Sequence, residues 1–424
     1  MATNIRSVKG TVDFYPEEMA LRTWLYSILR EVSESFGYQE WEAPILETLE
    51  LYAAKSGEEL VKEQSFVFED RGGNMITLRP ELTPSLARMV AQRQHQLTYP
   101  LRWWSFGPMW RYERPQKGRT REFFQWNIDQ LGVDTPEADA EMVAIGATLL
   151  KTVGLQPDQV SILVNNRRLM DAQLGKLDIE PEKRPHVVRL IDRRDKLKPE
   201  AWHTFGLELG LTEAQIAGIV ALLENTEMWQ ESEELVRFFH ALEAMGVREY
   251  VQFAPHIVRG LDYYTGTVFE AQATRGKFRA IFGGGRYDNL VADVGGQPLS
   301  GTGFAMGDKV FPIVLKEFGV LPDVSQLGIH PVLMTVFNED TLLDAFSLAA
   351  ELRETGLNVA MYPTPDKLGK QFKYADRISA RVAVVLGPDE LANGKAAVKN
   401  LATREQITVP REQVGNTILE MLSA

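Results

Sequence analysis

The spacing of apolar residues predicts a chain that alternates between helices and strands. Apolar side chains recur at helical spacing over residues 17–36, and Gly37 ends the run. A second helix is predicted after Pro84, and a third over residues 137–153. A fourth is predicted over residues 304–319, where a glycine closes the run.

Strands are predicted where aromatic and β-branched residues gather. Residues 101–114 and 121–133 are rich in aromatic side chains, and the basic segment between them predicts two antiparallel strands joined by a charged loop. Residues 66–81 predict a hairpin that turns at a Gly-Gly-Asn sequence. Shorter strands are predicted at residues 161–166, 265–274 and 279–288, and an extended stretch over residues 38–52.

Changes in these patterns predict the domain organisation. Residues 167–250 are helical and polar, which favours a helical module inserted between parts of one sheet domain, 1–166 and 251–323. A linker follows Leu321, and strands then alternate with helices. This alternation predicts a separate α/β domain with a parallel sheet over residues 330–424.

Composition narrows the class of protein. The 424 residues carry a net charge of -12, which excludes a protein that binds nucleic acid non-specifically over its whole surface. Any contact with nucleic acid must use local basic patches. The absence of cysteine excludes disulfides and thiolate metal sites, and the histidines show no metal-binding spacing. We expect no membrane span, no secretory signal and a cytoplasmic location.

Three polar clusters could carry chemistry. The first lies in the charged loop and contains Arg111, Arg114, Lys117, Arg119 and Arg121. These side chains suit phosphate or carboxylate oxygens. A solvated hairpin tip is the alternative interpretation. The second runs from Arg259 to Glu270. There Tyr263 and Tyr264 are adjacent and, if extended, cannot face one core together. A structural Arg–Asp pair is the alternative there.

The third cluster is rich in glycine, at residues 283–288 and 301–307. It matches neither a P-loop nor a dinucleotide fingerprint, so tight sheet packing competes with close approach of a ligand. A basic stripe is also predicted near the C-terminus: Lys367, Lys370, Lys373, Arg377 and Arg381. It suits an RNA backbone, but a solvated helix face is the more common outcome.

Together these segments resemble the histidyl-tRNA synthetases over nearly the whole chain. The blocks that carry the resemblance are VKGTVDFYP, TLRPELT, RYERPQKGRTREFFQWNID, RGLDYYT and GGGRYD. The resemblance implies an α+β fold: a class II synthetase core with an antiparallel sheet, a helical insertion and a C-terminal α/β anticodon-binding domain. It also implies ATP and Mg²⁺, L-histidine and tRNA(His) as ligands, and a homodimer formed through residues 38–60.

The resemblance further implies the site residues. Arg259 and Arg111 are expected to be catalytic. The expected histidine-binding residues are Glu81, Leu82, Thr83, Arg111, Gln125, Asp129, Arg259, Tyr263 and Tyr264. The expected ATP-binding residues are Arg111, Glu113, Arg119 and Phe123, and the expected tRNA-binding residues are Arg114, Gln116, Lys370, Lys373 and Arg377. No metal-binding side chain is predicted.

One position departs from the family pattern. Where most members carry an arginine that covers adenine, this chain has Val310, and the adjacent Lys309 is expected to point elsewhere on a helix. A cation–π contact worth about 0.5–2 kcal/mol is therefore missing or replaced.

Two rival classes of protein compete with a synthetase. The histidine-binding regulatory subunit of ATP phosphoribosyltransferase typically lacks the C-terminal domain and catalytic arginines. A protein that only binds tRNA leaves the tyrosine and glutamine positions unexplained.

Overall fold

The computed structural model describes residues 5–53, 64–114, 118–258 and 263–423. The chain forms two compact units, residues 1–322 and 323–424, and each is described by itself. Among the described helices, none is long and apolar enough to cross a membrane.

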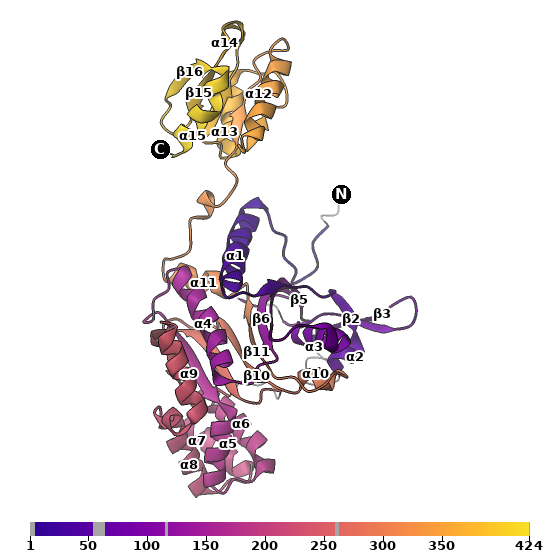
Figure 1. Ribbon diagram of the computed structural model, residues 1–424, viewed down its shortest axis with the longest axis vertical. Coiled ribbons are helices and arrows are strands. Elements are labelled where there is room, and N and C mark those ends of the chain that lie inside the picture. The colour runs from indigo at the N-terminus through magenta and orange to yellow at the C-terminus, as the bar shows by residue number, and fades with distance from the viewer. Residues whose placement is uncertain (1–4, 54–63, 115–117, 259–262, 424) are drawn as a thin grey trace. The chain divides into compact units, whose positions relative to one another are not determined.

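An eight-stranded sheet forms the centre of the first unit (Figure 1). Its order is β1 (Gln39–Glu40), β5 (Leu101–Trp110), β6 (Glu122–Leu131), β11 (Gly301–Gly307), β10 (Phe282–Tyr287), β9 (Thr267–Ala273), β7 (Val160–Asn166) and β8 (Val251–Phe253). All pairs are antiparallel except β1 with β5 and β7 with β8. The predicted antiparallel sheet is therefore confirmed, as is the hairpin of β3 (Phe66–Glu69) and β4 (Met75–Leu78), which pairs with β2 (Leu46–Thr48).

Helices cover both faces of this sheet. The helices are α1 (Pro16–Ser35), α2 (Leu49–Ala53), α3 (Thr83–Arg93), α4 (Pro136–Thr152), α10 (Leu290–Asp293) and α11 (Phe311–Glu317). Along β6, Trp126 and Ile128 point to the apolar core shared with α1 and α4. The alternate residues Phe123, Gln125 and Asp129 point to the opposite face, which we call the site face. Its apolar cluster includes Leu86 and Val90 of α3.

The predicted helix over residues 304–319 is wrong in its first part. Gly301–Gly307 form β11 between β6 and β10, and the helix begins only at Phe311. The pattern there has period two, since Phe304 and Met306 both point into the core. Glycine is required on the other face, because a Cβ on Gly303 would lie 2.2 Å from Asp129 Oδ1.

The segment from 167 to 250 is helical, as predicted. It contains α5 (Arg167–Lys176), α6 (Arg184–Asp192), α7 (Pro199–Glu208), α8 (Glu213–Glu224) and α9 (Glu233–Ala244). Buried residues such as Leu190, Ile216 and Phe238 belong to the same apolar cluster as the sheet core. The division of this unit into a core and an insertion domain stays a prediction.

The second unit has a five-stranded sheet in the order β13 (Val359–Met361), β12 (Val332–Met334), β14 (Val382–Val385), β15 (Lys395–Asn400) and β16 (Gln406–Pro410). Its helices are α12 (Leu342–Glu354), α13 (Leu368–Arg377), α14 (Pro388–Ala392) and α15 (Val414–Ser423). The first three strands are parallel, as predicted, but β15 and β16 are antiparallel and correct that prediction. The short connections on either side of β15 cannot make a parallel crossover.

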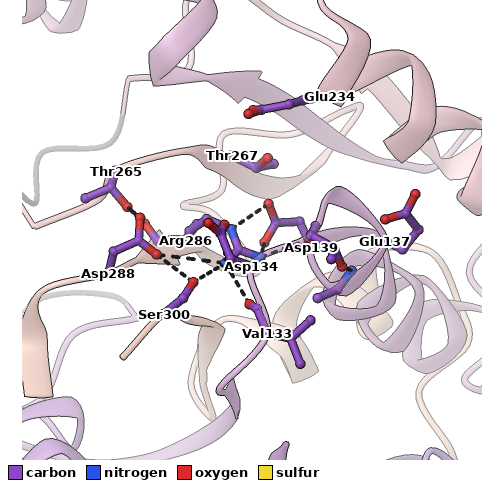
Figure 2. A network of polar contacts seen from close by, with 12 residues as sticks. Val133, Asp134, Glu137, Asp139, Glu234, Thr265, Thr267, Arg286, Asp288 and Ser300 are labelled. Atoms are coloured by element: carbon purple, nitrogen blue, oxygen red, sulfur yellow. Dashed lines mark hydrogen bonds and ion pairs between the residues drawn. The ribbon is translucent and has the colours of Figure 1, made fainter. Parts of the chain in front are cut away.

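A buried arginine ties together the strands and helix that frame the site face (Figure 2). Arg286 on β10 has a side chain only 2% exposed and lies 2.8 Å from Asp139 in the first turn of α4. Its guanidinium also donates to the carbonyls of Val133 and Thr135, at 2.9 and 3.0 Å. Burial raises the pKa of Asp139, and the charge and hydrogen bonds of Arg286 oppose that change. One side chain thus joins β10 to the loop between β6 and α4.

We predict that Asp139→Ala lowers the free energy of unfolding by about 3–5 kcal/mol, because it removes the closest and most buried carboxylate from the buried Arg286. The more exposed Asp134 and Asp288, at 3.3 and 3.9 Å, remain. Urea denaturation measures the loss. Glu137→Ala is the matched control: Glu137 lies in the same helical turn but pairs with Arg237 where both side chains are about half exposed. The control should change stability little, and equal losses would contradict the assignment.

Candidate active site

Small residues leave room above the site face. Gln125 and Asp129 of β6 lie opposite Gly307 and Gly303 of β11, which carry no side chains. A Cβ on Gly307 would meet no atom within 4 Å, so this end of the strand borders open space. The site face therefore has open space over the glycines of β11, beside the polar side chains of β6.

A cavity of about 340 Å³ opens at that end of the sheet. Its wall combines the hairpin that follows β5 with the strands β10 and β11: Arg111, Glu113, Gly118, Arg119, Thr120, Phe123, Arg279, Ala280, Ile281, Phe282, Gly283, Ala305, Gly307, Lys309 and Val310. Four of these are cationic and one is a carboxylate. The cavity suits an anionic ligand with a flat apolar part.

Arg111 is held firmly at this wall. Its Nε donates to the carbonyl of Pro80 at 2.9 Å, and its guanidinium lies 5.3 Å from the centre of the Phe123 ring. Burial lowers the pKa of Arg111, while the nearby Glu81 and Tyr263 raise it. Arginine stays charged under this shift because its ordinary pKa is so high. Arg111 is thus a fixed cation between Phe123 and the predicted histidine-binding residues.

The other cations of the charged loop differ in role. Arg119 forms an ion pair with the buried Glu113. Arg121 instead lies 3.9 Å from the centre of the Tyr112 ring, and its backbone N–H donates to the carbonyl of Gly10. Arg114 is exposed. The cations of this loop that the structure describes therefore do not act as one cluster, since Arg121 fastens the hairpin to the N-terminal segment.

A second polar group lies deeper on the site face. Asp129 is 5% exposed, and its Oδ1 accepts a hydrogen bond of 2.5 Å from the Tyr287 hydroxyl. Burial raises the pKa of Asp129 to about 7, against the opposing effect of that hydrogen bond. Tyr287 was not among the residues predicted from the sequence. The only signal was its position in the GGGRYD segment.

The expectation that Tyr263 and Tyr264 face opposite sides is wrong. Their ring centres lie 4.8 Å apart, and Tyr263 also packs at 6.2 Å against Tyr287. The rule of alternation does not apply, because both residues precede β9 and are not in a strand. Both tyrosines therefore lie beside the group that contains Asp129.

The segment Glu81–Thr83 lies at the start of α3. Leu82 is buried at the N-cap position, and the carbonyl of Glu81 accepts a hydrogen bond of 3.2 Å from the Tyr52 hydroxyl. Since the preceding carbonyl, of Pro80, binds Arg111, this helix start is placed next to the cationic wall.

Lys309 also corrects an expectation. It lies between β11 and α11, not on a helix, and it lines the cavity together with Val310. Its Nζ is 3.0 Å from Asp308 Oδ2 and 4.9 Å from the centre of the Phe14 ring. Asp308 in turn accepts a hydrogen bond of 2.9 Å from the backbone of Phe124. Lys309, which precedes Val310, thus still places a cation at the cavity wall.

The remaining predicted residues lie elsewhere. Gln116, Lys117 and Arg259 lie outside the described residues. Lys370, Lys373 and Arg377 are exposed on α13 of the second unit, where Lys370 also pairs with Asp366. Arg381, the last member of the predicted stripe, follows the end of that helix and corrects its extent. In the part of the chain that the structure describes, no three acidic or histidine side chains are grouped to hold a metal ion.

Comparison with known proteins agrees with this geometry. The profile of the histidyl-tRNA synthetase family matches residues 10–309, and that of the anticodon binding domain matches residues 326–421. The chain belongs to the histidyl-tRNA synthetase family. The fold predicted from the resemblance, with its antiparallel sheet and C-terminal anticodon-binding domain, is thereby confirmed.

Individual relatives are similar along almost their full length. The chloroplastic/mitochondrial histidine–tRNA ligase of Arabidopsis thaliana is 37% identical over 96% of this chain and 85% of its own. The histidine–tRNA ligase of Haloarcula marismortui is 36% identical over 95% of both. The crystal structure of histidyl-tRNA synthetase from Nostoc sp. superposes with a TM-score of 0.85 at 25% identity, covering 99% of each chain.

The raised pKa of Asp129 predicts a pH-dependent stability. An unfolded aspartate titrates near pH ~4, whereas folded Asp129 titrates at about 7. The proton on Asp129 therefore stabilises the folded state fully at pH values below ~4. This stabilisation is lost as the pH rises towards about 7. Urea denaturation measures the free energy of unfolding of the unaltered protein and of Asp129→Asn. Between these two pH values, the free energy of unfolding of the unaltered protein should fall relative to that of the variant, and above the higher value the difference should stay constant.

The matched control is Asp158→Asn, which removes an exposed carboxyl from the same unit. Its difference from the unaltered protein should stay nearly constant across the interval. A constant difference for Asp129→Asn as well would show that Asp129 is ionised throughout.

Proposed function

We propose that this protein is a histidine–tRNA ligase, which activates L-histidine with ATP and transfers it to the 3′ end of tRNA(His). The observation that carries the proposal is the position of Arg111. It lines the cationic cavity, stacks on Phe123, and interacts electrostatically with Glu81 and Tyr263 of the neighbouring polar group. A cation there can contact a nucleotide phosphate and an amino-acid carboxylate together.

The first step joins two anions. The histidine carboxylate attacks the α-phosphorus of ATP, the acyl–phosphate bond forms, and pyrophosphate leaves. Negative charge then builds on the phosphate oxygens, and a fixed cation such as Arg111 stabilises it without reorganising. We assign adenine to Phe123, the outer phosphates to Arg119, which Glu113 orients, and a second catalytic charge to Arg259. Mg²⁺ would arrive with the ATP phosphates, since the described residues offer no cluster of ligands for it.

The pocket around Asp129 suits the imidazole ring. Imidazole needs a partner for each ring nitrogen, and a carboxylate supplies an acceptor for its N–H. We assign Asp129 and Gln125 to the ring, and Tyr263 and Tyr264 to its sides. Glu81, Leu82 and Thr83 would receive the α-amino group at the start of α3. Tyr287 would keep Asp129 oriented through their hydrogen bond.

The second step needs tRNA and, we propose, two copies of the chain. Arg114 and Gln116 would meet the acceptor end, and the second unit would bind the anticodon region. Large apolar side chains around the small sheet of the first unit are exposed, which supports a homodimer contact there: Ile45, Leu46, Phe68 and Met75. The cytoplasmic location expected from the sequence stays a prediction.

The regulatory paralog of ATP phosphoribosyltransferase is the weaker alternative. The chain keeps a C-terminal unit that matches an anticodon binding domain, and Arg111 is present at the cavity wall. A protein that regulates another enzyme by binding histidine does not need an anticodon-binding unit.

The deciding measurement is exchange of pyrophosphate into ATP, followed by charging of tRNA(His). We expect exchange that requires histidine, and a loss of about 10²–10³ in kcat for Arg111→Ala, as for removal of one group that stabilises developing charge. Asp129→Ala should raise the KM for histidine. Histidine binding without any exchange would favour the regulatory paralog instead.

The basic stripe makes a separate prediction about tRNA. Replacing Lys370, Lys373 and Arg377 with glutamine should make the salt dependence of tRNA binding shallower, by about 0.7–0.9 in log–log slope for each phosphate that a cation no longer neutralises. Filter binding over a range of salt concentrations measures the slope. Replacing Lys395 and Arg404, exposed on β15 and in the β15–β16 turn, is the control. If both variants keep the original slope, the stripe is a solvated face.

A further inference from the structure

One charge of the cationic cavity is balanced by no residue in the part of the chain that the structure describes. Of its four cations, Arg111 is bound to the Pro80 carbonyl, Arg119 to Glu113, and Lys309 to Asp308. Among the described residues, none forms a hydrogen bond or an ion pair with the fourth, Arg279. Arg279 lies between β9 and β10, outside the charged loop that supplies Arg111 and Arg119.

Arg279 also repels Arg111 across this cavity. Burial is the main cause of the lowered pKa of Arg111, and the charge of Arg279 lowers that pKa further. Arg279 is exposed, so its charge is available to a ligand in the cavity, and an anion between the two cations would offset their repulsion. Arginine suits this task because its planar donors match phosphate oxygens in pairs.

Val310 explains why the cavity needs the positive charge of Arg279. It lines the same cavity, and its Cγ2 lies 3.8 Å from the position of a Cβ built on Gly118. Val310 therefore presents an apolar surface towards the charged loop, and the cation beside it, Lys309, is already paired with Asp308. The flat part of a nucleotide can pack between Val310 and Phe123, but its phosphates need charge from another strand.

We propose that Arg279 binds the phosphates of ATP and supplies the positive charge that Val310 does not. The inference rests on the proposed function and assigns this chain's own residue to the nucleotide. Arg279 contacts the triphosphate, not the base, so adenosine binds without its help. Lys309, which Asp308 already neutralises, contributes less.

The test compares ATP with adenosine as probes of the full-length protein. Arg279→Ala should raise the KM for ATP in pyrophosphate exchange about tenfold, the effect of removing one charge-assisted hydrogen bond. Binding of adenosine, measured by calorimetry, should change less than about twofold. Arg279→Lys should recover part of the loss, because it keeps the charge but not the paired donors.

Lys277→Ala is the matched control. Lys277 is exposed on the same connection between β9 and β10 but does not line the cavity, so its removal should leave the KM for ATP unchanged. An unaltered KM for Arg279→Ala, or an equal loss of ATP and adenosine binding, would overturn the inference. Absence of exchange in the unaltered protein would instead overturn the proposed function.

Discussion

The buried pair of Arg286 and Asp139 is the interaction on which the geometry of the site depends most. Two charges removed from water are costly unless they are matched closely, and here the guanidinium also binds two backbone carbonyls. The pair therefore fixes β10 against the start of α4. Because adjacent residues of a strand face opposite sides, it also fixes Tyr287, which points to the site face and binds Asp129.

The same network reaches the tyrosine segment. Asp288 accepts hydrogen bonds from Thr265 and Ser300, at 2.5 and 2.6 Å, and the N–H of Thr265 donates to the carbonyl of Arg286. Thr265 follows Tyr264 directly, so the network places both tyrosine rings beside Asp129. One network thus connects the two faces of β10. The buried pair of Arg286 and Asp139 holds the core face in place, and Tyr287 on the site face lies with Asp129 among groups that can contact a ligand.

Local pattern was enough to predict most strands, the long helices and the charged hairpin. The aromatic bias of residues 121–133 correctly predicted the strand β6. The failures came from contacts between distant segments. Nothing near Gly303 in the sequence shows that it must lie against Asp129, so the local pattern predicted a helix where β11 lies. Tyr287 was missed for the same reason, because it meets Asp129 only when β10 and β6 come together in one sheet.

The pairing of β6 with β11 also governs how the first unit can be made on the ribosome. These strands are far apart in the chain, yet β11 lies directly between β6 and β10 in the sheet. Residues 122–131 must wait for residues 301–307 before the sheet closes, and such non-local pairing slows folding. The backbone edge of β6 that pairs with β11 is unpaired during that interval. A nascent chain of this family therefore needs protection from aggregation until nearly three quarters of it has been synthesised, whereas the C-terminal unit closes over short sequence distances.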